Sequence, residues 1–384
     1  MRVLAVTGIR SEYDILQPVL QALVQTQGFE VMVAVTGAHL SATFGETVYE
    51  IEKDGFTIVD TIETLLDSHR KSSRVKGLGI ALMGLVQTVE RVKPELLLVV
   101  GDREEAMATA LVGAYCDVLV AHIAGGDRVV GNVDDQVRHA VSRLAHIHYV
   151  TNRDSGERLE KMGEQAFRII NAGTPGIDRL MSEPMLTIAE INQQLGINLP
   201  ENSPYLMVLQ HVISSEAEQG YWQMQQTLEA IKQLALPAVV IYPNSDAGGR
   251  AMITCIEDYQ AQQFFVAKKN IPRLAFVNLL RHTACLIGNS SAGIMEAPAL
   301  HLPVINVGKR QQGRLHANNV QFVAHDVEAI VSAVKRAVFD DDYRKTVAQC
   351  ATPYGDGTAA HSIVSHLKEQ DWQQPYWYIK DVTY

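Results

Sequence analysis

Residues 95–102 read "ELLLVVGD", an uninterrupted apolar run that ends in a glycine and an aspartate. Four similar runs occur in the first half of the chain: "RVLAVTGI" (2–9), "VMVAVTG" (31–37), "VLVAHIAGG" (118–126) and "IHYVTN" (147–152). Helix-length intervals separate them, and runs without polar alternation are typical of strands buried on both faces of a parallel sheet. The first half of the chain is therefore predicted to be a doubly wound α/β domain.

A second series of apolar runs begins after the polar segment 182–204. Its members are "YLMVLQH" (205–211), "AVVIYPNSD" (238–246), "FFVAKK" (264–269), "CLIGNSS" (285–291) and "PVINVG" (303–308). The predicted fold class is α/β, with two doubly wound, Rossmann-like domains. We place the N-terminal domain at 1–178, the C-terminal domain at 179–364, and at 365–384 a segment that can return to the first domain.

Length and charge restrict the class of protein. A chain of 384 residues exceeds what one hydrophobic core usually serves, which agrees with two domains. Hydrophobic residues make up 47% and charged residues 20%, which is the composition of a folded globular protein and not of a disordered one. The net charge of −10 argues against a general nucleic-acid or membrane-surface partner, so a site for an anion must be built from local cations.

The expected compartment is the cytoplasm. No apolar run approaches the roughly 18 residues that cross a bilayer, and Arg10 and Glu12 interrupt the first run too early for a secretory signal. The four cysteines lack any Cys-x-x-Cys spacing and fit reduced thiols better than a disulfide framework or a zinc site. They are Cys116, Cys255, Cys285 and Cys350.

Polar clusters follow most of the predicted strands. Examples are "GIRSEYD", "GDREE", "IAGGDR", "PNSDAGGR", "GNSSAG" and "GKRQQGR". Ligands of open parallel sheets bind at the carboxyl ends of the strands, so two such domains that face each other would line a cleft with these loops.

The cluster "GNSSAGIMEAPAL" (288–300) is a candidate diphosphate site, because Ser290 and Ser291 stand between a strand and a helix start. A serine N-cap on a tight turn explains the same residues without a ligand. Glu296, about one turn into the helix, suits a ribose diol or simply favours the helix dipole.

Local positive charge follows the next predicted strand in "GKRQQGR" (308–314), where Arg310 and Arg314 can balance a diphosphate. The alternative is a solvated basic loop. His211, at the end of "YLMVLQH", can donate to a phosphate or act as an acid, or be a hydrogen-bonded histidine at a strand end.

The stretch "HIAGGDRVVGNVDDQVRH" (122–139) gathers charge at the end of a buried strand. Asn132 can cap a helix whose first turn holds Asp134 and Asp135, with Arg138 four residues after Asp134. A capped surface helix explains this pattern in part, but it leaves the preceding Gly-Gly-Asp at the strand end unexplained.

Other common signatures are absent from the sequence. There is no G-x-G-x-x-G, no P-loop motif and no G-x-S-x-G. Three histidines could suggest a metal ion, but their spacing supplies no convincing set of ligands, and no metal site is predicted. These histidines are His139, His146 and His148.

Nine motifs in order resemble the hydrolysing UDP-N-acetylglucosamine 2-epimerases of bacterial sialic-acid and legionaminic-acid synthesis. They are "TGIRSEYDIL", "TGAHLSATFG", "GDREE", the stretch 122–139, "LQHVISSE", "YPNSDAGG", "GNSSAGIMEAPAL", "INVGKRQQGR" and "PYGDGTAAH". The resemblance implies a GT-B-like fold, release of UDP and N-acetylmannosamine or an analogue through a 2-acetamidoglucal, and no metal or redox cofactor. "GIRSE" and "QHVISSE" stand where the non-hydrolysing branch usually has "GTRPE" and "HRREN", which favours the hydrolysing branch.

The resemblance also implies roles for individual residues. On the nucleotide side these are Arg10 and His211 at the phosphates, Ser290 and Ser291 at the diphosphate, Glu296 at the ribose, and Arg310 with Arg314 as counter-charge. On the sugar side they are Asp102, Asp134 and Arg138, with His39 nearby.

Ala124 departs from the family, whose members commonly have a glutamate or histidine there. A methyl group cannot transfer a proton, so another carboxylate must act near C2 of the sugar. Because Arg138 is expected to favour the charged form of Asp134, we rank Asp102 first as the base and Asp127 second.

Several alternatives stay open from the sequence. The substrate can carry uridine or guanosine, and a 4-hydroxyl or a 4-acetamido group. A non-hydrolysing epimerase, a glycosyltransferase of the same fold and a non-catalytic nucleotide-sugar sensor are further alternatives. The expected partners are a nucleotide-sugar substrate and further copies of the chain, as a dimer or tetramer, with neither nucleic acid nor membrane.

Overall fold

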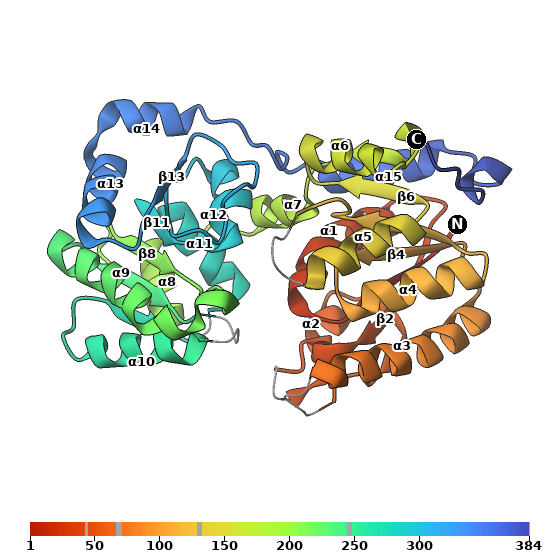
Figure 1. The fold of residues 1–384 in the computed structure, drawn as a ribbon, viewed down its shortest axis with the longest axis horizontal. Coiled ribbons are helices and arrows are strands. Elements are labelled where there is room, and N and C mark those ends of the chain that lie inside the picture. The colour runs from red at the N-terminus through yellow and green to blue at the C-terminus, as the bar shows by residue number, and fades with distance from the viewer. Residues whose placement is uncertain (43–44, 67–70, 129–132, 244–247, 270, 384) are drawn as a thin grey trace. The chain divides into compact units, whose positions relative to one another are not determined.

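The structure is a computed structural model that describes residues 1–384 except 43–44, 67–70, 129–132, 244–247, 270 and 384 (Figure 1). The chain forms two compact units. The first consists of Met1–Met181 together with Tyr354–Tyr384, and the second of Ser182–Pro353. Each unit is built around one parallel sheet, which confirms the predicted fold class of two Rossmann-like α/β domains.

The sheet of the first unit has seven strands in the order β3-β2-β1-β4-β5-β6-β7. The strands are β1 (Arg2–Thr7), β2 (Glu30–Thr36), β3 (Thr57–Ile62), β4 (Leu96–Val100), β5 (Leu119–Ile123), β6 (Ile147–Val150) and β7 (Ile169–Asn171). β1, β4, β5 and β6 are buried almost throughout, as expected of central parallel strands.

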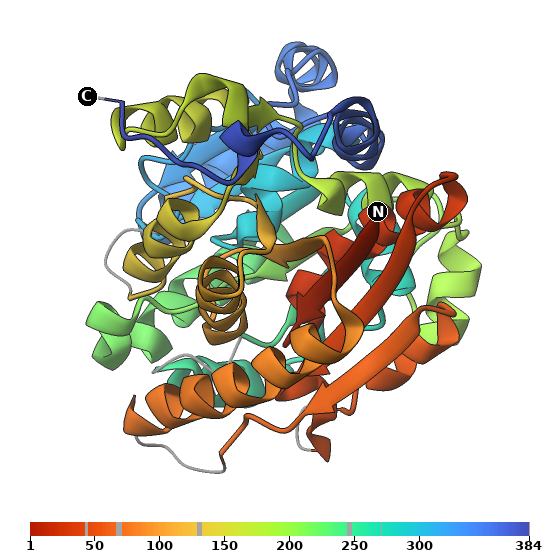
Figure 2. The same ribbon diagram turned by 90° about the vertical axis from the view of Figure 1, so that its right-hand side faces the viewer.

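Helices cover both faces of this sheet (Figure 2). They are α1 (Arg10–Gln25), α2 (Val48–Lys53), α3 (Lys71–Val92), α4 (Glu104–Tyr115), α5 (Val133–Leu144), α6 (Arg153–Lys161), α7 (Pro175–Ser182) and α15 (Ala359–Glu369). One core lies between the sheet and α1 with α15, and a second core lies between the opposite face and α3, α4 and α5.

The sheet of the second unit has six strands in the order β10-β9-β8-β11-β12-β13. They are β8 (Leu206–Leu209), β9 (Ala238–Ile241), β10 (Val266–Lys268), β11 (Cys285–Gly288), β12 (Val304–Val307) and β13 (Val320–Val323). The helices are α8 (Ile188–Leu195), α9 (Gly220–Leu234), α10 (Gly249–Gln260), α11 (Arg273–His282), α12 (Ser291–Met295), α13 (Val327–Phe339) and α14 (Asp341–Ala348). The core on one face packs α9, α10 and α13 against the strands.

The unit boundaries differ from the predicted 178/179 and 364/365. The helix α15 packs on α1, and the Asp178 carboxylate accepts hydrogen bonds from the Ala360 amide at 2.7 Å and the Ala359 amide at 3.2 Å. These contacts satisfy amides at the start of α15 and attach the whole helix to the first unit. The chain therefore returns at Tyr354, earlier than the sequence indicated.

Both sheets reverse their strand order at one place, between β1 and β4 in the first unit and between β8 and β11 in the second. Such a point leaves a crevice at the carboxyl ends of the two strands, and ligands of doubly wound sheets bind there. Within the described part of the chain, no helix is both long enough and apolar enough to span a membrane.

Candidate active site

Arg138 gathers two of the predicted carboxylates at the carboxyl edge of the first sheet. Asp102 follows β4, directly after Gly101, whose φ of +75° turns the chain away from the strand. The guanidinium of Arg138, on α5 and only 8% exposed, forms an ion pair with Asp102 and lies 3.4 Å from Asp127 Oδ2. Burial of an arginine between two acids keeps all three groups in fixed positions.

Asp127 is held on its other side by hydroxyl groups. Its Oδ1 accepts hydrogen bonds from Thr151 Oγ1 at 2.7 Å and from Ser155 Oγ at 2.6 Å. With Arg138 on Oδ2, this carboxylate is bonded on both oxygens, so its geometry suits positioning better than proton transfer.

Asp134, in the first turn of α5, differs from the sequence prediction. It pairs with Arg74 at 3.4 Å, and Arg74 in turn binds Glu104. Burial and the negative charge of Asp102 raise the pKa of Asp134, although Arg74 opposes them. The sequence assigned Arg138 to this carboxylate, but Arg138 binds Asp102 and Asp127, and the desolvation of the helix start opposes the expected shift toward the charged form.

Ala124 lies at the turn that ends β5. Its φ is +62°, a left-handed conformation in which few residues with a side chain are found, and it is 6% exposed. Its carbonyl accepts a hydrogen bond from Arg138 Nη1 at 3.3 Å. The backbone of this position thus contributes to the site, while its side chain supplies only a methyl group.

His39 lies in the turn Gly37–Leu40, directly after β2. It is fully buried, with Nε2 3.0 Å from Thr7 Oγ1 and Nδ1 2.7 Å from Thr47 Oγ1. Burial lowers its pKa to about 4, so the ring is neutral at pH 7. The expected contact with the sugar does not fit this geometry, because both ring nitrogens are already hydrogen-bonded to threonines.

Arg10 is the first residue of α1, immediately beyond the end of β1. Its guanidinium lies 3.9 Å from the carboxylate of Glu50, and its side chain is 29% exposed. The side chain is therefore only partly buried.

Two further carboxylates lie at the same sheet edge and were not selected from the sequence. Glu12 accepts a hydrogen bond from the Gly8 amide at 2.9 Å, and a Cβ atom at Gly8 would overlap the carboxylate of Glu105. Burial raises the pKa of both acids, and Glu105 also raises that of Glu12. The signal was present in "GIRSE" and "GDREE", whose glutamates these are, but single acids near a helix start are usually read as dipole partners.

In the second unit, Asn289 connects the loops after three strands. Its side chain accepts from the His211 amide at 2.7 Å and donates to the His211 carbonyl at 2.9 Å. Its own carbonyl accepts from Arg310 Nη1 at 3.2 Å and from Gln311 Nε2 at 3.0 Å. His211 and Arg310, both predicted from the sequence, are thus brought together by a residue that the sequence analysis quoted without selecting.

The loop after β11, which carries Ser290 and Ser291, has the geometry of a serine N-cap. Ser290 caps α12 by accepting from the Ala292 amide at 3.3 Å, and Ser291 is the first residue of that helix. The helix ends at Met295, so its dipole is small. Any anion at this loop must therefore be held mainly by hydroxyls, amides and Arg310.

Glu296 directly follows the last residue of α12 and is ion-paired with Arg273 of α11 at 2.8 Å. The pair engages one carboxylate oxygen of Glu296, Oε1. Arg314 lies in the loop between β12 and β13, half-buried.

Three parts of the sequence prediction lie outside the described residues. These are residues 43–44 of "TGAHLSATFG", residues 129–132 with the Asn132 cap of α5, and residues 244–247 of "YPNSDAGG". Among the residues that the structure does describe, no group of three or more His, Cys, Asp or Glu side chains could hold a metal ion.

Comparison with known proteins now identifies the family. Residues 21–368 match the family described as UDP-N-acetylglucosamine 2-epimerase. The chain belongs to this family. Among its relatives, the hydrolysing UDP-N,N'-diacetylbacillosamine 2-epimerase of Legionella pneumophila is 33% identical over 96% of this chain and 95% of that protein. The hydrolysing GDP/UDP-N,N'-diacetylbacillosamine 2-epimerase of Campylobacter jejuni is 27% identical over 83% of each chain.

Solved structures of the 2-epimerase family share the fold. The crystal structure of UDP-GlcNAc 2-epimerase from Neisseria meningitidis, bound to UDP-GlcNAc, has a TM-score of 0.83 and 20% identity, covering 96% of this chain and 100% of that one. The two Rossmann-like domains of this 2-epimerase family member are therefore those of a GT-B-like fold.

Proposed function

We propose that this family member is a hydrolysing 2-epimerase. Its substrate is UDP-N-acetylglucosamine or a close analogue, and its products are UDP and N-acetylmannosamine or the matching analogue. The observation that carries this proposal is the buried arginine held between Asp102 and Asp127, with Asp134 on the same helix and its pKa raised. The names of the Legionella and Campylobacter relatives support the hydrolysing branch. A cytoplasmic homo-oligomer that serves sialic- or legionaminic-acid synthesis is part of the same proposal.

The chemistry requires two kinds of group. The C2 proton of an N-acetylhexosamine is not acidic until the bond from C1 to the diphosphate oxygen breaks and leaves positive charge at C1. A carboxylate then takes the C2 proton, and the electrons of that C–H bond form the C1–C2 double bond of a 2-acetamidoglucal. A proton delivered to the opposite face of C2, and the hydroxide of a water added at C1, complete the hydrolytic inversion.

We assign the proton transfer at C2 to Asp134 ahead of Asp102. Asp102 is held by its ion pair with the buried guanidinium of Arg138, so its geometry suits positioning. Asp134 has a raised pKa and a side chain that is 25% exposed, so it combines basicity with access. A carboxyl group whose pKa is shifted toward neutral transfers protons more effectively at pH 7.

The leaving diphosphate needs cations and hydrogen-bond donors. In the second unit we assign this task to His211, Arg310 and the hydroxyls of Ser290 and Ser291, which follow neighbouring strands. Arg10 and Arg314 are assigned as further phosphate ligands, and Glu296 binds the ribose. Charge-assisted hydrogen bonds to the oxygens that gain charge lower the barrier to C1–O cleavage.

A second candidate substrate is a nucleotide-linked 2,4-diacetamido sugar. Ala124 supports it, because a methyl group leaves room where the family resemblance implies a longer side chain. The names of two relatives, both diacetylbacillosamine 2-epimerases, point to the same sugar class.

A time course followed by NMR in D2O tests the proposed function on a small panel of UDP- and GDP-linked 2-acetamido and 2,4-diacetamido sugars. The expected result is free nucleoside diphosphate and a free 2-epimerised sugar with deuterium at C2. Retention of the nucleotide on the epimerised sugar would indicate a non-hydrolysing epimerase. A requirement for an acceptor would indicate a glycosyltransferase, and binding without turnover a sensor.

A further inference from the structure

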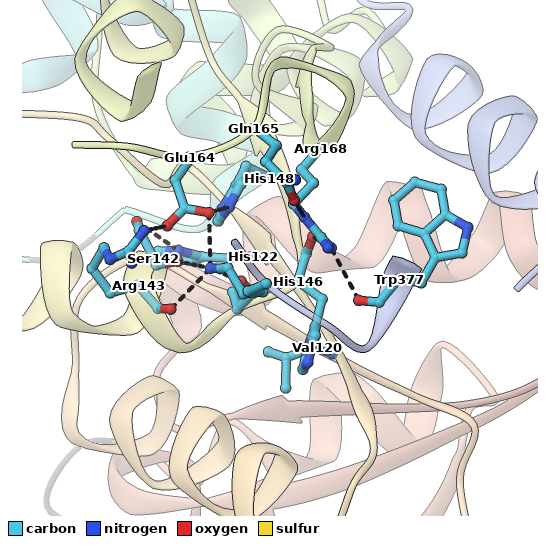
Figure 3. A network of polar contacts seen from close by, with 12 residues as sticks. Val120, His122, Ser142, Arg143, His146, His148, Glu164, Gln165, Arg168 and Trp377 are labelled. Carbon is cyan, nitrogen blue, oxygen red and sulfur yellow. Dashed lines mark hydrogen bonds and ion pairs between the residues drawn. The ribbon is translucent and has the colours of Figure 1, made fainter. Parts of the chain in front are cut away.

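A buried carboxylate connects three distant segments of the first unit. Glu164 has a side chain with no exposed surface. It binds Arg143 of α5 and lies 2.9 Å from His148 Nε2 on β6 (Figure 3). It also lies 2.8 Å from Lys380 Nζ in the C-terminal tail. Burial alone would raise the pKa of Glu164, but the His148 and Lys380 contacts lower it to about 2. The carboxylate is therefore charged throughout the neutral range.

Lys380 caps the carboxyl end of α5. Its Nζ donates to the carbonyls of Ser142 at 3.3 Å, Arg143 at 2.9 Å and Ala145 at 2.5 Å. The last carbonyls of a helix have no partner within the helix, and a lysine there satisfies them and complements the helix dipole. A residue near the chain's end thus caps the helix that carries Asp134 and Arg138.

The tail that carries Lys380 is itself fixed by Arg168, which is fully buried. The Arg168 guanidinium donates to the carbonyl of Trp377 at 3.0 Å (Figure 3). It also donates to the carbonyls of Ile379, at 2.8 Å, and Tyr376. Three backbone bonds from one arginine leave the tail little freedom. The C-terminal tail therefore holds the ammonium group of Lys380 in place beside α5.

The capped end of α5 is connected to the candidate site through one turn of helix. Ser142 Oγ donates to the Arg138 carbonyl at 3.0 Å and lies 3.2 Å from His122 Nδ1. The other ring nitrogen, His122 Nε2, lies 2.7 Å from the carbonyl of Gly101, the residue before Asp102. A displacement of the carboxyl end of α5 would therefore change the separation of Arg138 from Asp102.

We infer that Lys380 is a positioning residue for the sugar-side site, holding α5 so that Arg138 reaches Asp102 and Asp127. The kinetic test of this inference rests on the proposed function, because kcat measures the turnover that we propose. Lys380 touches neither the substrate nor the reacting atoms, and it acts on them through α5.

The contacts of Lys380 with Glu164 and with the carboxyl end of α5 depend on the positive charge of its ammonium group. Burial lowers the pKa of Lys380 to about 8, while Glu164 opposes that shift. The other ionisable groups around it are Arg143, His146, His148 and Arg168. A neutral amine has one donor fewer and no ion pair with Glu164, so the hold on α5 weakens as the pH rises through about 8. An arginine at this position would stay charged.

The test compares K380M, K380R and the control K368M, which changes an exposed lysine of α15 in the same unit. For each variant we would measure kcat from pH 6.5 to 9.5, UDP affinity by calorimetry, and hydrogen exchange of the α5 amides. We expect K380M to lower kcat about ten- to hundredfold at pH 7, the scale of a small misplacement of catalytic groups, and to speed exchange across Val133–Leu144. UDP affinity should stay within about twofold, because none of the residues assigned to the nucleotide lies on α5.

K380R gives the result that separates positioning from general stability. It should restore most of kcat at pH 7 and remove the decline above pH 8 that we expect of the wild-type protein. An unchanged kcat and unchanged α5 exchange in folded K380M would overturn the inference, as would an alkaline decline that persists in K380R. If K380M fails to fold, the pH profile of K380R still tests whether the decline of kcat above pH 8 comes from loss of the charge on Lys380. Wild-type protein without turnover on any sugar would refute the proposed function, and α5 exchange in the variants would still test the role of Lys380.

Discussion

Arg138 Nη1 lies 3.4 Å from Asp127 Oδ2 while the same guanidinium binds Asp102, so one buried arginine spans the ends of two neighbouring strands, β4 and β5. Residues that follow adjacent parallel strands end at one edge of the sheet, and a single planar cation can then bind both. Because the arginine lies on α5, the position of this helix sets the geometry of both acids.

Replacement of Arg138 by methionine should destabilise the protein as well as inactivate it. The change leaves two poorly solvated carboxylates without their counter-ion, and removal of one partner of a buried ion pair costs about 3–5 kcal/mol. Urea unfolding at pH 7 measures this loss. R153M, at a guanidinium whose side chain is 84% exposed, is the control and should change the free energy of unfolding by less than about 1 kcal/mol. A stability equal to that of the wild type would show that the pair is not formed.

The double variant S290A/S291A should bind UDP more weakly. Each hydroxyl is assigned one hydrogen bond to a charged phosphate oxygen, and such a bond contributes about 1.5–3 kcal/mol. Calorimetric titration with UDP gives the change directly. S203A, at an exposed serine of the second unit, serves as control. Wild-type affinity in the double variant would remove the serine loop from the nucleotide site and leave it as the helix cap that Ser290 already forms.

Stability should fall as the pH is lowered from 7 toward 4, because three buried histidines stay neutral in the folded protein. Burial lowers the pKa of His39 and His146 to about 4 and that of His122 to about 3. In the unfolded chain these groups titrate near 6.5, so below that pH the unfolded state binds more protons and is favoured. Each histidine contributes up to about 1.4 kcal/mol per pH unit between its two pKa values.

Urea unfolding at pH 7, 6 and 5 measures this slope. H146Q removes one contributor and should flatten the slope, while H361Q, at an exposed histidine of α15, should leave it unchanged. A slope that is the same in both variants would show that His146 is protonated in the folded protein.

Much of the fold could be predicted because central strands leave a strong signal. Strands such as β4 and β5 are buried on both faces and read as continuous apolar runs. β3, β7 and β13 were not predicted, and each of them lies at an edge of its sheet and is only partly buried. In an edge strand such as "TIVDTI" the apolar run is broken by polar residues, so the signal disappears.

The candidate site was predicted less completely, because its decisive contacts are long-range. Spacing along α5 suggested that Arg138 would pair with Asp134, but the sheet brings Asp102 and Asp127 to the arginine instead. Lys380 gave no signal, since a single lysine near a chain end resembles any solvated charge. Only the three-dimensional return of the tail reveals its contact with α5.

From the sequence, Asp102 ranked first as the base that removes the C2 proton, whereas we assign this role to Asp134. Substitutions at the two positions distinguish these assignments. If Asp134 removes the C2 proton, D134N should abolish deuterium incorporation at C2 while UDP affinity stays within a few fold. D102N should act differently, because the loss of one partner of Arg138 disturbs the site and stability together: residual exchange should remain, and the free energy of unfolding should fall by about 3–5 kcal/mol. D154N, at an exposed acid of α6, controls for the charge change. Native exchange in D134N together with complete loss in a folded D102N would return the role of base to Asp102.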